Sequence, residues 1–381
     1  ITLKSKPGDH VIISGSVELT GWAPLAEADA RGNTNFGHIY YVDLTWKPTR
    51  LDENGVKLEQ AKSPNTGWWV VEAGSDATHI VDSAHLTQSD PNYWVGAELY
   101  YRDMQPVIEH RANVTAYDPA THTVTIDGNL SWTNSSGVEY PPVPGIDRYQ
   151  MFNKLEFLDR PGEWVAEDRH DGTYRVYVWP TESGPADDEL YEVTTQTNSL
   201  IAVSSRSYIT IDGFEVRHTT GYAKAVSVSG SDHITIRNCV ANYNDYMGFS
   251  ISDSDFVTLS NSISTLNGYG VAIGGSSDIT VEECEISRGS VDGLVISYDS
   301  HRVYVRRNYI HDHVLYGHPD NLQFHHGVYD IWYEDNAIIN SGQSCMMEAG
   351  YGIHFINNII AASGGYMLHT GNPSTDIELR N

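Results

Sequence analysis

A short unit of alternating residues recurs through the C-terminal half of the chain and limits the possible folds more than any other feature. In each unit a polar or amphipathic residue stands between two apolar ones, as in Ile209-Thr-Ile and Ile234-Thr-Ile. The units begin at Ile209, Ile234, Val257, Ile279, Val303, Ile331, Ile353 and Ile377 and recur every 22 to 28 residues. Such alternation is typical of a β-strand with one buried face. A repeat of this length predicts a solenoid.

A second short apolar segment lies between successive units, from Val226-Ser-Val to Tyr366-Met-Leu. Two or three strands per repeat, with no helical period, predict one coil of a parallel β-helix. Asn308, Asn336 and Asn358 follow three units at the same offset, so we expect a ladder of stacked, hydrogen-bonded side chains. A leucine-rich repeat is disfavoured because its Leu and Asn spacing and its helical segment are absent, and a β-propeller needs four strands in a longer repeat.

The N-terminal half is organised differently. Residues 1–20 predict a first coil, with strand, Lys-Pro-Gly-Asp turn and strand in succession. Residues 21–150 contain longer, antiparallel-looking strands and predict a β-rich insertion. We expect the β-helix body to occupy residues 151–381. We also expect truncation at both ends, because an uncapped solenoid exposes core and unpaired strand edges.

Charge and composition narrow the possible partners. The chain has 50 Asp and Glu against 23 Lys and Arg, a net charge of -27, which argues against nucleic acid and anionic membranes as partners. The sequence contains no run of 18 apolar residues, so it predicts no membrane-spanning helix. Cys239, Cys284 and Cys345 lack CxxC spacing and are expected to be buried free thiols. The many Trp, Tyr, Asn, Ser and Gly residues are typical of glycan-handling proteins, so we expect a secreted, extracellular or periplasmic protein.

Several scaffold motifs resemble a known group of proteins. Residues 1–15, 153–164 and 173–180, together with the later coils, resemble the right-handed parallel β-helix carbohydrate-active enzymes. The likeness is to β-helix glycoside hydrolases with an N-terminal β-rich insertion, and the chain is also similar to β-helix polysaccharide lyases and epimerases. The resemblance implies an all-β, right-handed solenoid whose partner is a polysaccharide or oligosaccharide. These motifs specify the fold better than the chemistry.

Aligning the repeats in register converts the sequence into columns of lateral neighbours. An outward column on the second strand contains Ser252, Gly274, Ser297, His325, Glu348 and His369. A column in the preceding turn contains Met247, Tyr269, Asp292, Asp320 and Gln343. The longest repeat holds the His- and Asp-rich stretch 311–321 beside these columns. Insertions in solenoids concentrate on the binding face, so we expect the functional site here.

Asp320 and Glu348 form the leading candidate pair for glycoside hydrolysis, which needs one protonated acid and one base or nucleophile. Asp292 is the reserve, close enough to Asp320 for like-charge repulsion to raise the pKa of one of them. The other candidate catalytic residues are His318 and His325. The candidate substrate-binding residues are His326, His369, Tyr316, Tyr298 and Gln323, and Trp332 is a further candidate for stacking on sugar faces.

Simpler interpretations of the same residues stay open. Acids are common on β-helix turns, and two stacked acids could form a structural calcium site. Calcium is the one cofactor that the sequence leaves open, and no other cofactor is expected. His311 and His313 are a weak hint of a metal site, since strand alternation sends both to one face and Asp312 to the other. A solvated, His-rich turn is the favoured interpretation.

Two other functions compete with hydrolysis. In a polysaccharide lyase or uronan C5-epimerase, a His or Tyr base removes a proton while Lys, Arg or calcium neutralises the substrate carboxylate. No lysine follows Lys224, and the candidate face has a surplus of acids, which favours a neutral glycan and a hydrolase. The third alternative is a non-catalytic, glycan-binding adhesin or spike, against which the crowded titratable side chains count.

Overall fold

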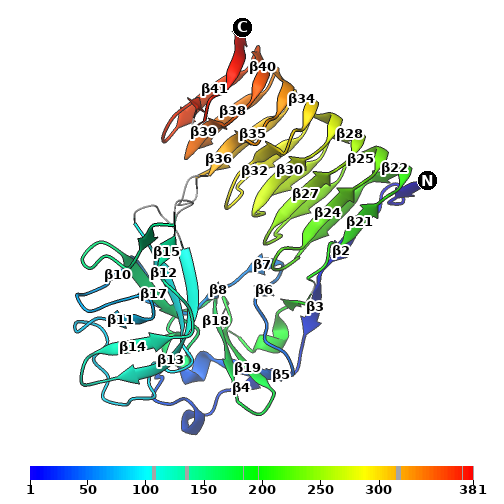
Figure 1. Ribbon diagram of the computed structural model, residues 1–381. Coiled ribbons are helices and arrows are strands. Elements are labelled where there is room, and N and C mark those ends of the chain that lie inside the picture. Colours follow the sequence, from blue (N-terminus) through cyan, green and yellow to red (C-terminus); the bar gives the residue numbers. More distant parts are fainter. Residues whose placement is uncertain are drawn as a thin grey trace. The chain divides into compact units, whose positions relative to one another are not determined.

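A computed structural model describes residues 1–104, 109–133, 137–182, 184–195, 197–314, 319–370 and 372–380. The chain divides into two compact units (Figure 1). Unit 1 contains residues 1–17 and 194–381, and unit 2 contains residues 18–193. In the sequence, unit 2 is therefore inserted after the first strands of unit 1.

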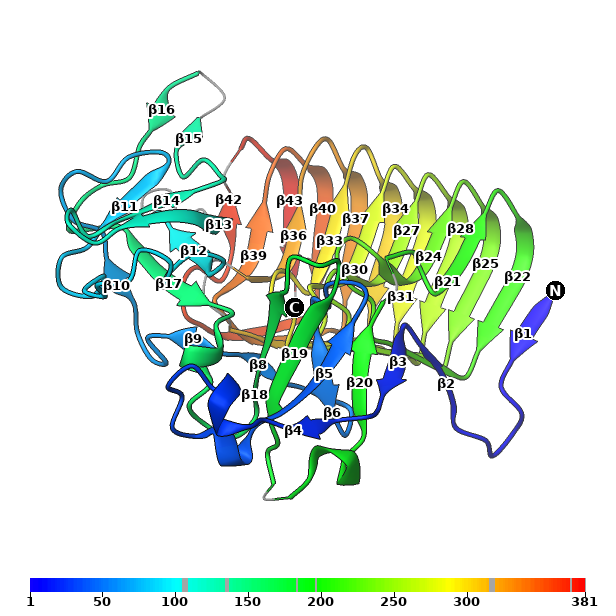
Figure 2. The same cartoon turned by 90° about the horizontal axis from the view of Figure 1, so that it is seen from below.

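Unit 1 is an all-β, right-handed parallel β-helix, which confirms the predicted fold class. Its strands stack into three parallel sheets, visible as successive rungs in Figure 2. The first sheet contains β1 (Thr2–Lys4), β22 (Ser207–Asp212), β25 (Asp232–Arg237), β28 (Asp255–Ser260), β31 (Ser277–Glu282), β34 (His301–Arg306), β37 (Tyr329–Glu334), β40 (Tyr351–Ile356) and β43 (Thr375–Arg380).

The other two sheets contain the shorter strands of each rung. The second sheet contains β2 (Val11–Ser14), β23 (Phe214–Arg217), β26 (Val240–Asn242), β29 (Ile263–Thr265), β32 (Glu285–Ser287), β35 (Tyr309–His313), β38 (Ala337–Ser341) and β41 (Ile359–Ser363). The third sheet contains β21 (Ile201–Ser204), β24 (Lys224–Ser229), β27 (Met247–Ser252), β30 (Tyr269–Gly274), β33 (Leu294–Ser297), β36 (Asp320–Phe324), β39 (Gln343–Met347) and β42 (His369–Thr370).

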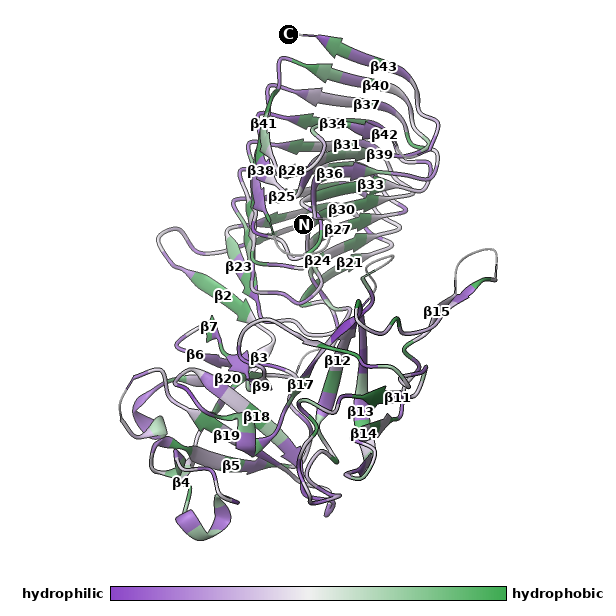
Figure 3. Ribbon diagram, turned by 90° about the vertical axis from the view of Figure 1, so that its left-hand side faces the viewer, coloured by the Kyte–Doolittle hydropathy of each residue, from purple (hydrophilic) through white to green (hydrophobic). Residues whose placement is uncertain are grey.

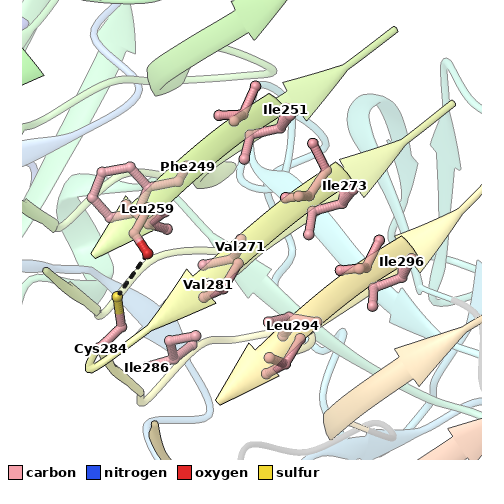
Figure 4. Close-up of a cluster of buried hydrophobic side chains, with 14 of the residues drawn as sticks. Phe249, Ile251, Leu259, Val271, Ile273, Val281, Cys284, Ile286, Leu294 and Ile296 are labelled. Carbon is pink, nitrogen blue, oxygen red and sulfur yellow. Dashed lines mark hydrogen bonds between the residues drawn. The ribbon is translucent and has the colours of Figure 1, made fainter. Parts of the chain in front are cut away.

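The alternating units lie in register along the first sheet. Ile209 pairs with Ile234, Ile234 with Val257, and the same register continues to Ile377. The inward residues of all three sheets form one hydrophobic cluster, and Figure 4 shows Ile251, Ile273 and Ile296 repeating on successive strands. Burying one such side chain contributes roughly 1.5–3 kcal/mol relative to leaving it exposed. Repetition of the unit therefore stabilises the whole solenoid.

Polar ladders occupy the turns between the sheets. The backbone N–H of Asn308 donates to Asn336 Oδ1 at 2.9 Å, and that of Asn336 donates to Asn358 Oδ1 at 2.9 Å. The predicted asparagine ladder is therefore confirmed. Cys284 continues it, because its N–H donates to Asn308 Oδ1 at 2.9 Å and its sulfur lies 3.8 Å from the Leu259 carbonyl oxygen (Figure 4). Cys239, Cys284 and Cys345 are all buried and free, as expected.

Unit 2 is built from mainly antiparallel sheets. The largest contains β10 (Trp69–Val70), β17 (Arg148–Phe152), β12 (Glu98–Arg102), β13 (Glu109–Asp118), β14 (Thr123–Ile126) and β11 (His79–Val81), with β9 (Lys62–Ser63) also paired to β17. Another contains β4 (Ala23–Pro24), β5 (Tyr40–Leu44), β19 (Tyr174–Trp179), β18 (Glu163–Asp168) and β8 (Glu59–Gln60), and in this sheet the pair β8 and β18 is parallel. Buried residues of unit 2 form hydrophobic cores of their own.

The remaining elements are short. They are β3 (Ser16–Leu19), β20 (Tyr191–Thr194), β6 (Leu51–Glu53), β7 (Val56–Lys57), β15 (Trp132–Thr133), β16 (Glu139–Tyr140) and the 3-10 helices Glu27–Asp29, Phe36–His38, Leu155–Phe157 and Ala186–Asp188. Figure 3 shows hydrophobic segments along the strands of the third sheet, such as β27 and β30. No helix in the described part of the chain is long and apolar enough to cross a membrane.

The expected boundary at residues 150/151 differs from the observed one. Residues 151–193 lie in unit 2, where β18 and β19 form an antiparallel pair. The first four residues of β18 are all buried. Such a buried run looks in sequence like a strand of the solenoid. Unit 1 instead resumes at Thr194, and its next β-helix strand, β21, begins at Ile201.

Candidate active site on the third sheet

The outward face of β33, β36 and β39 carries the predicted strand column. The N–H of His325 donates to the Ile296 carbonyl at 3.1 Å, and that of Glu348 donates to the Phe324 carbonyl at 2.9 Å. These bonds continue the pairing of Ile296 with Phe324 and of Phe324 with Met347. His325 and Glu348 are therefore neighbours on adjacent rungs. Gln323 stands two residues before His325 on the same outward face.

Two acids of the predicted turn column are in direct contact. The backbone N–H of Asp320 donates to Asp292 Oδ1 at 2.9 Å. Asp320 also pairs with Gln343 on the next rung. Asp320 is 0% exposed and Asp292 is 5% exposed. The turn column therefore places the Asp292 carboxyl group against the backbone of Asp320, with both residues buried.

This setting changes the protonation of Asp320. Burial, followed by the negative charges of Asp292 and Glu348, raises the pKa of Asp320 to about 8, although a hydrogen bond from Gln343 opposes the shift. The direction agrees with the repulsion expected from the sequence. Asp320 is consequently protonated at neutral pH. A carboxylic acid that keeps its proton at neutral pH can serve as a general acid.

A histidine pair follows β36. Burial, and next the charge of His326, lowers the pKa of His325, while Glu348 opposes the shift. The Tyr298 ring stacks on His326 at 4.9 Å and meets His325 edge-on at 6.0 Å. Tyr298 and His326 have positive φ angles of 53° and 60°, so the chain turns sharply where each strand ends. Tyr298 is 61% exposed and is available to a ligand.

His369 does not lie in the predicted position. It pairs with Met346 and not with Glu348, which is a shift of two residues along the strand. The turn before β42 is two residues longer than the repeat spacing predicted. The N–H of Ser344 donates to the carbonyl of Tyr366, and β42 begins only at His369. The His369 ring stacks on Tyr366 at 4.8 Å.

Trp332 belongs to another face. It lies on β37 in the first sheet, stacked between Tyr304 at 4.8 Å and His354 at 5.2 Å. The expectation that Trp332 joins the carboxyl site is therefore wrong, because its unit belongs to the first strand of the rung. His318 and Tyr316 lie outside the described residues.

His311 and His313 have different surroundings, contrary to the prediction of one shared face. Asp312 has a positive φ of 62°, which interrupts strand alternation. His311 stacks on Tyr309 at 3.7 Å and bonds to Asp312 at 2.9 Å. His313 is fully buried, lies 2.8 Å from Asn321 Oδ1, and has its pKa lowered to about 4 by burial. Among the described residues, no group of three or more His, Cys, Asp or Glu side chains could hold a metal ion.

Sequence reasoning missed a row of tyrosines that leads to the acids. Tyr222 meets Tyr246 at 5.4 Å, and Tyr246 meets Tyr269 at 5.7 Å, both edge-on. Tyr269 is close enough to Asp292 for that charge, after burial, to raise the pKa of Tyr269. Tyr222 is 84% exposed. The turn column already contained Tyr269, and this was the signal that could have revealed the row.

Comparisons with known proteins agree with the fold. A family model described as "Right handed beta helix region" matches residues 199–381. No curated protein matches the chain by sequence. A solved structure titled "Glycoside hydrolase" aligns with a TM-score of 0.65 and 14% identity over 98% of this chain and 83% of that chain.

A second solved structure, titled "The complex structure of XylC with xylose", aligns with a TM-score of 0.58 and 12% identity. The alignment covers 100% of this chain and 60% of that chain, so this chain spans about three fifths of that protein's length. At these identities the two likenesses establish the fold.

Proposed function

We propose that the protein is a glycoside hydrolase that cleaves a polysaccharide or oligosaccharide with carboxyl groups of the third sheet. One arrangement carries the proposal: Asp320 is buried, its backbone N–H donates to Asp292, and burial together with the charges of Asp292 and Glu348 raises its pKa to about 8. Glycoside hydrolysis requires this division between a protonated acid and a second carboxylate. The solved glycoside hydrolase of the same fold supports this assignment.

Each group has a distinct role in the proposed reaction. Asp320 donates its proton to the glycosidic oxygen as the bond to the leaving sugar breaks. Glu348 acts as the base or nucleophile toward the anomeric carbon. Asp292 positions Asp320 by accepting the backbone N–H of Asp320, and its negative charge helps to keep the pKa of Asp320 raised. Because Asp320 is buried, its neighbours, including Gln343, must shift when the substrate binds.

The charge of the site favours a neutral, hydroxyl-rich glycan. Strands β27, β30, β33, β36, β39 and β42 contain no Lys or Arg. The lysine of this sheet, Lys224, pairs with Met247 on the far side of Tyr269 from the acids. Tyr222, Tyr246 and Tyr269 offer aromatic contacts for sugar rings. The fold neighbour whose title names xylose is consistent with a neutral sugar.

One observation favours a lyase or epimerase as the second candidate. The lowered pKa of His325 leaves its ring neutral, and hence able to accept a proton, at neutral pH. Such an enzyme must also neutralise a uronate carboxylate, and the surrounding acids oppose this.

A reducing-end assay on a panel of xylan, glucomannan, galactan, alginate and pectin, with ultraviolet absorbance recorded in parallel, tests the proposal. We expect new reducing ends on a neutral polysaccharide, without the absorbance of unsaturated products, and their loss in Asp320→Asn. Both signals together would indicate a lyase. If neither signal appears, epimerisation or simple glycan binding is the remaining function. A polysaccharide substrate also leads us to propose a secreted, extracellular or periplasmic location.

A further inference from the structure

Unit 2 contains two adjoining cavities that the carboxyl site of the β-helix does not use. Their volumes are about 610 Å³ and 340 Å³. Both are lined by Trp69, Ala84 and His85, so these residues form a shared wall. The Trp69 and His85 rings stack in this wall at 4.8 Å with an interplanar angle of 14°.

The wall is held in place by a buried carboxylate. Asp82 is 1% exposed and accepts hydrogen bonds from His85 Nδ1 and the Tyr149 hydroxyl, both at 2.8 Å. Trp69 also meets Trp94 and Tyr149 edge-on, at 6.1 Å and 5.5 Å. The aromatic surface is therefore fixed before any ligand arrives. A preorganised surface loses little conformational entropy on binding.

The smaller cavity has hydrogen-bonding groups that the protein leaves unused. Asn65 Nδ2 donates to both carboxylate oxygens of Asp159, at 2.8 Å and 3.0 Å. Asn65 Oδ1 and Glu156 Oε2 are buried without a hydrogen-bond partner among the described residues. Buried polar atoms are normally hydrogen-bonded. Asn65 and Glu156 both line this cavity, and a ligand that brings hydrogen-bond donors would satisfy these two acceptors.

The remaining lining defines the chemistry of that ligand. Tyr93, Trp94 and Phe157 supply aromatic surface. The acids Glu156 and Asp159 are accompanied by one lysine, Lys62, which is already paired with Glu59. An anionic ligand would therefore be repelled. A pyranose ring has an apolar face for the aromatic rings and hydroxyl donors for the free acceptors.

We propose that the smaller cavity of unit 2 binds a neutral sugar unit of a glycan, as a site separate from the carboxyl groups of the β-helix. The inserted unit then acts as a carbohydrate-binding module, and the larger cavity across the Trp69 and His85 wall continues the site. This proposal does not depend on the activity of the β-helix.

Hydrogen exchange on the full chain, measured by mass spectrometry, tests the location. The probes are xylohexaose, cellohexaose and mannohexaose, each compared with protein alone. We expect at least one probe to slow exchange in residues 62–71 and 84–95. Protection confined to residues 292–348, or no protection by any of the three, would overturn the proposal. In Asp320→Asn, loss of reducing ends with retained protection of residues 62–71 separates this site from the proposed hydrolase.

Variants test the residues. Asn65→Ala and Tyr93→Ala each remove one ligand contact, and Trp132→Ala removes an aromatic side chain of unit 2 that lines neither cavity. Affinity electrophoresis in gels containing the polysaccharide of the protecting probe compares the three full-length variants. We expect about tenfold weaker retardation for Asn65→Ala and Tyr93→Ala, as for one lost hydrogen bond or stacking contact, and unchanged retardation for Trp132→Ala. Equal retardation of all three variants would refute the site.

Discussion

Replacing Asp320 by asparagine should stabilise the fold while abolishing activity. The pKa of Asp320 is raised from 3.8 to about 8 in the folded protein. Between these values the folded state holds a proton that the unfolded state has released, so the free energy of unfolding falls as pH rises. The slope is about 1.4 kcal/mol per pH unit. The asparagine side chain does not titrate, so Asp320→Asn should lack this slope.

The difference grows across a defined pH window. Wild type and Asp320→Asn should be equally stable near pH 4, and the variant should gain roughly 4 kcal/mol by pH 7, with little further gain above about pH 8. Urea unfolding followed by tryptophan fluorescence, at pH steps from 4 to 9, measures this difference. Asp253→Asn, which changes an exposed acid in a turn after β27, is the matched control. Parallel pH dependence in wild type and Asp320→Asn would refute the reasoning.

Four further results are expected. Hydrolysis should decline as pH rises through about 8, where Asp320 loses its proton, and Asp292→Asn should move this decline to lower pH; the pH profile of kcat/KM measures both. Tyr246→Ala should raise KM for long oligosaccharides several-fold, by about 1 kcal/mol of lost aromatic contact, with little effect on a short aryl glycoside. Asn336→Ala should lower the free energy of unfolding by about 1–3 kcal/mol, because the buried Asn308 N–H loses its acceptor; calorimetry measures this loss. Removal of divalent ions with EDTA should leave hydrolysis unchanged, whereas loss of activity that calcium restores would contradict the assigned roles.

The columns of the solenoid could be predicted because its geometry is regular. Strand alternation and the repeat length place Asp292 beside Asp320, and His325 beside Glu348, without knowledge of any turn. The predicted position of His369 was wrong because it depends on the length of the turn before β42. The prediction that Trp332 joins the carboxyl site was wrong because the sequence does not show which faces of the three sheets are adjacent.

Other features depend on contacts that no local pattern encodes. The complete burial of Asp320 depends on packing around the turn, so the sequence predicted a raised pKa for one of Asp292 and Asp320 but neither which of them nor the main cause. In unit 2, the tertiary fold brings Asn65 to Asp159 across 94 residues. The buried residues at the start of β18 resemble a strand of the solenoid in sequence, so the expected domain boundary was placed too early, at residues 150/151.

The protonation state of Asp320 can be measured directly. In protein labelled with carboxyl-¹³C aspartate, the signal that disappears in Asp320→Asn identifies this carboxyl group, and its chemical shift can be followed between pH 3 and pH 10. The proposed chemistry predicts a midpoint near 8. A midpoint near 4, the ordinary value for an aspartate, would remove the general acid on which the assigned function depends.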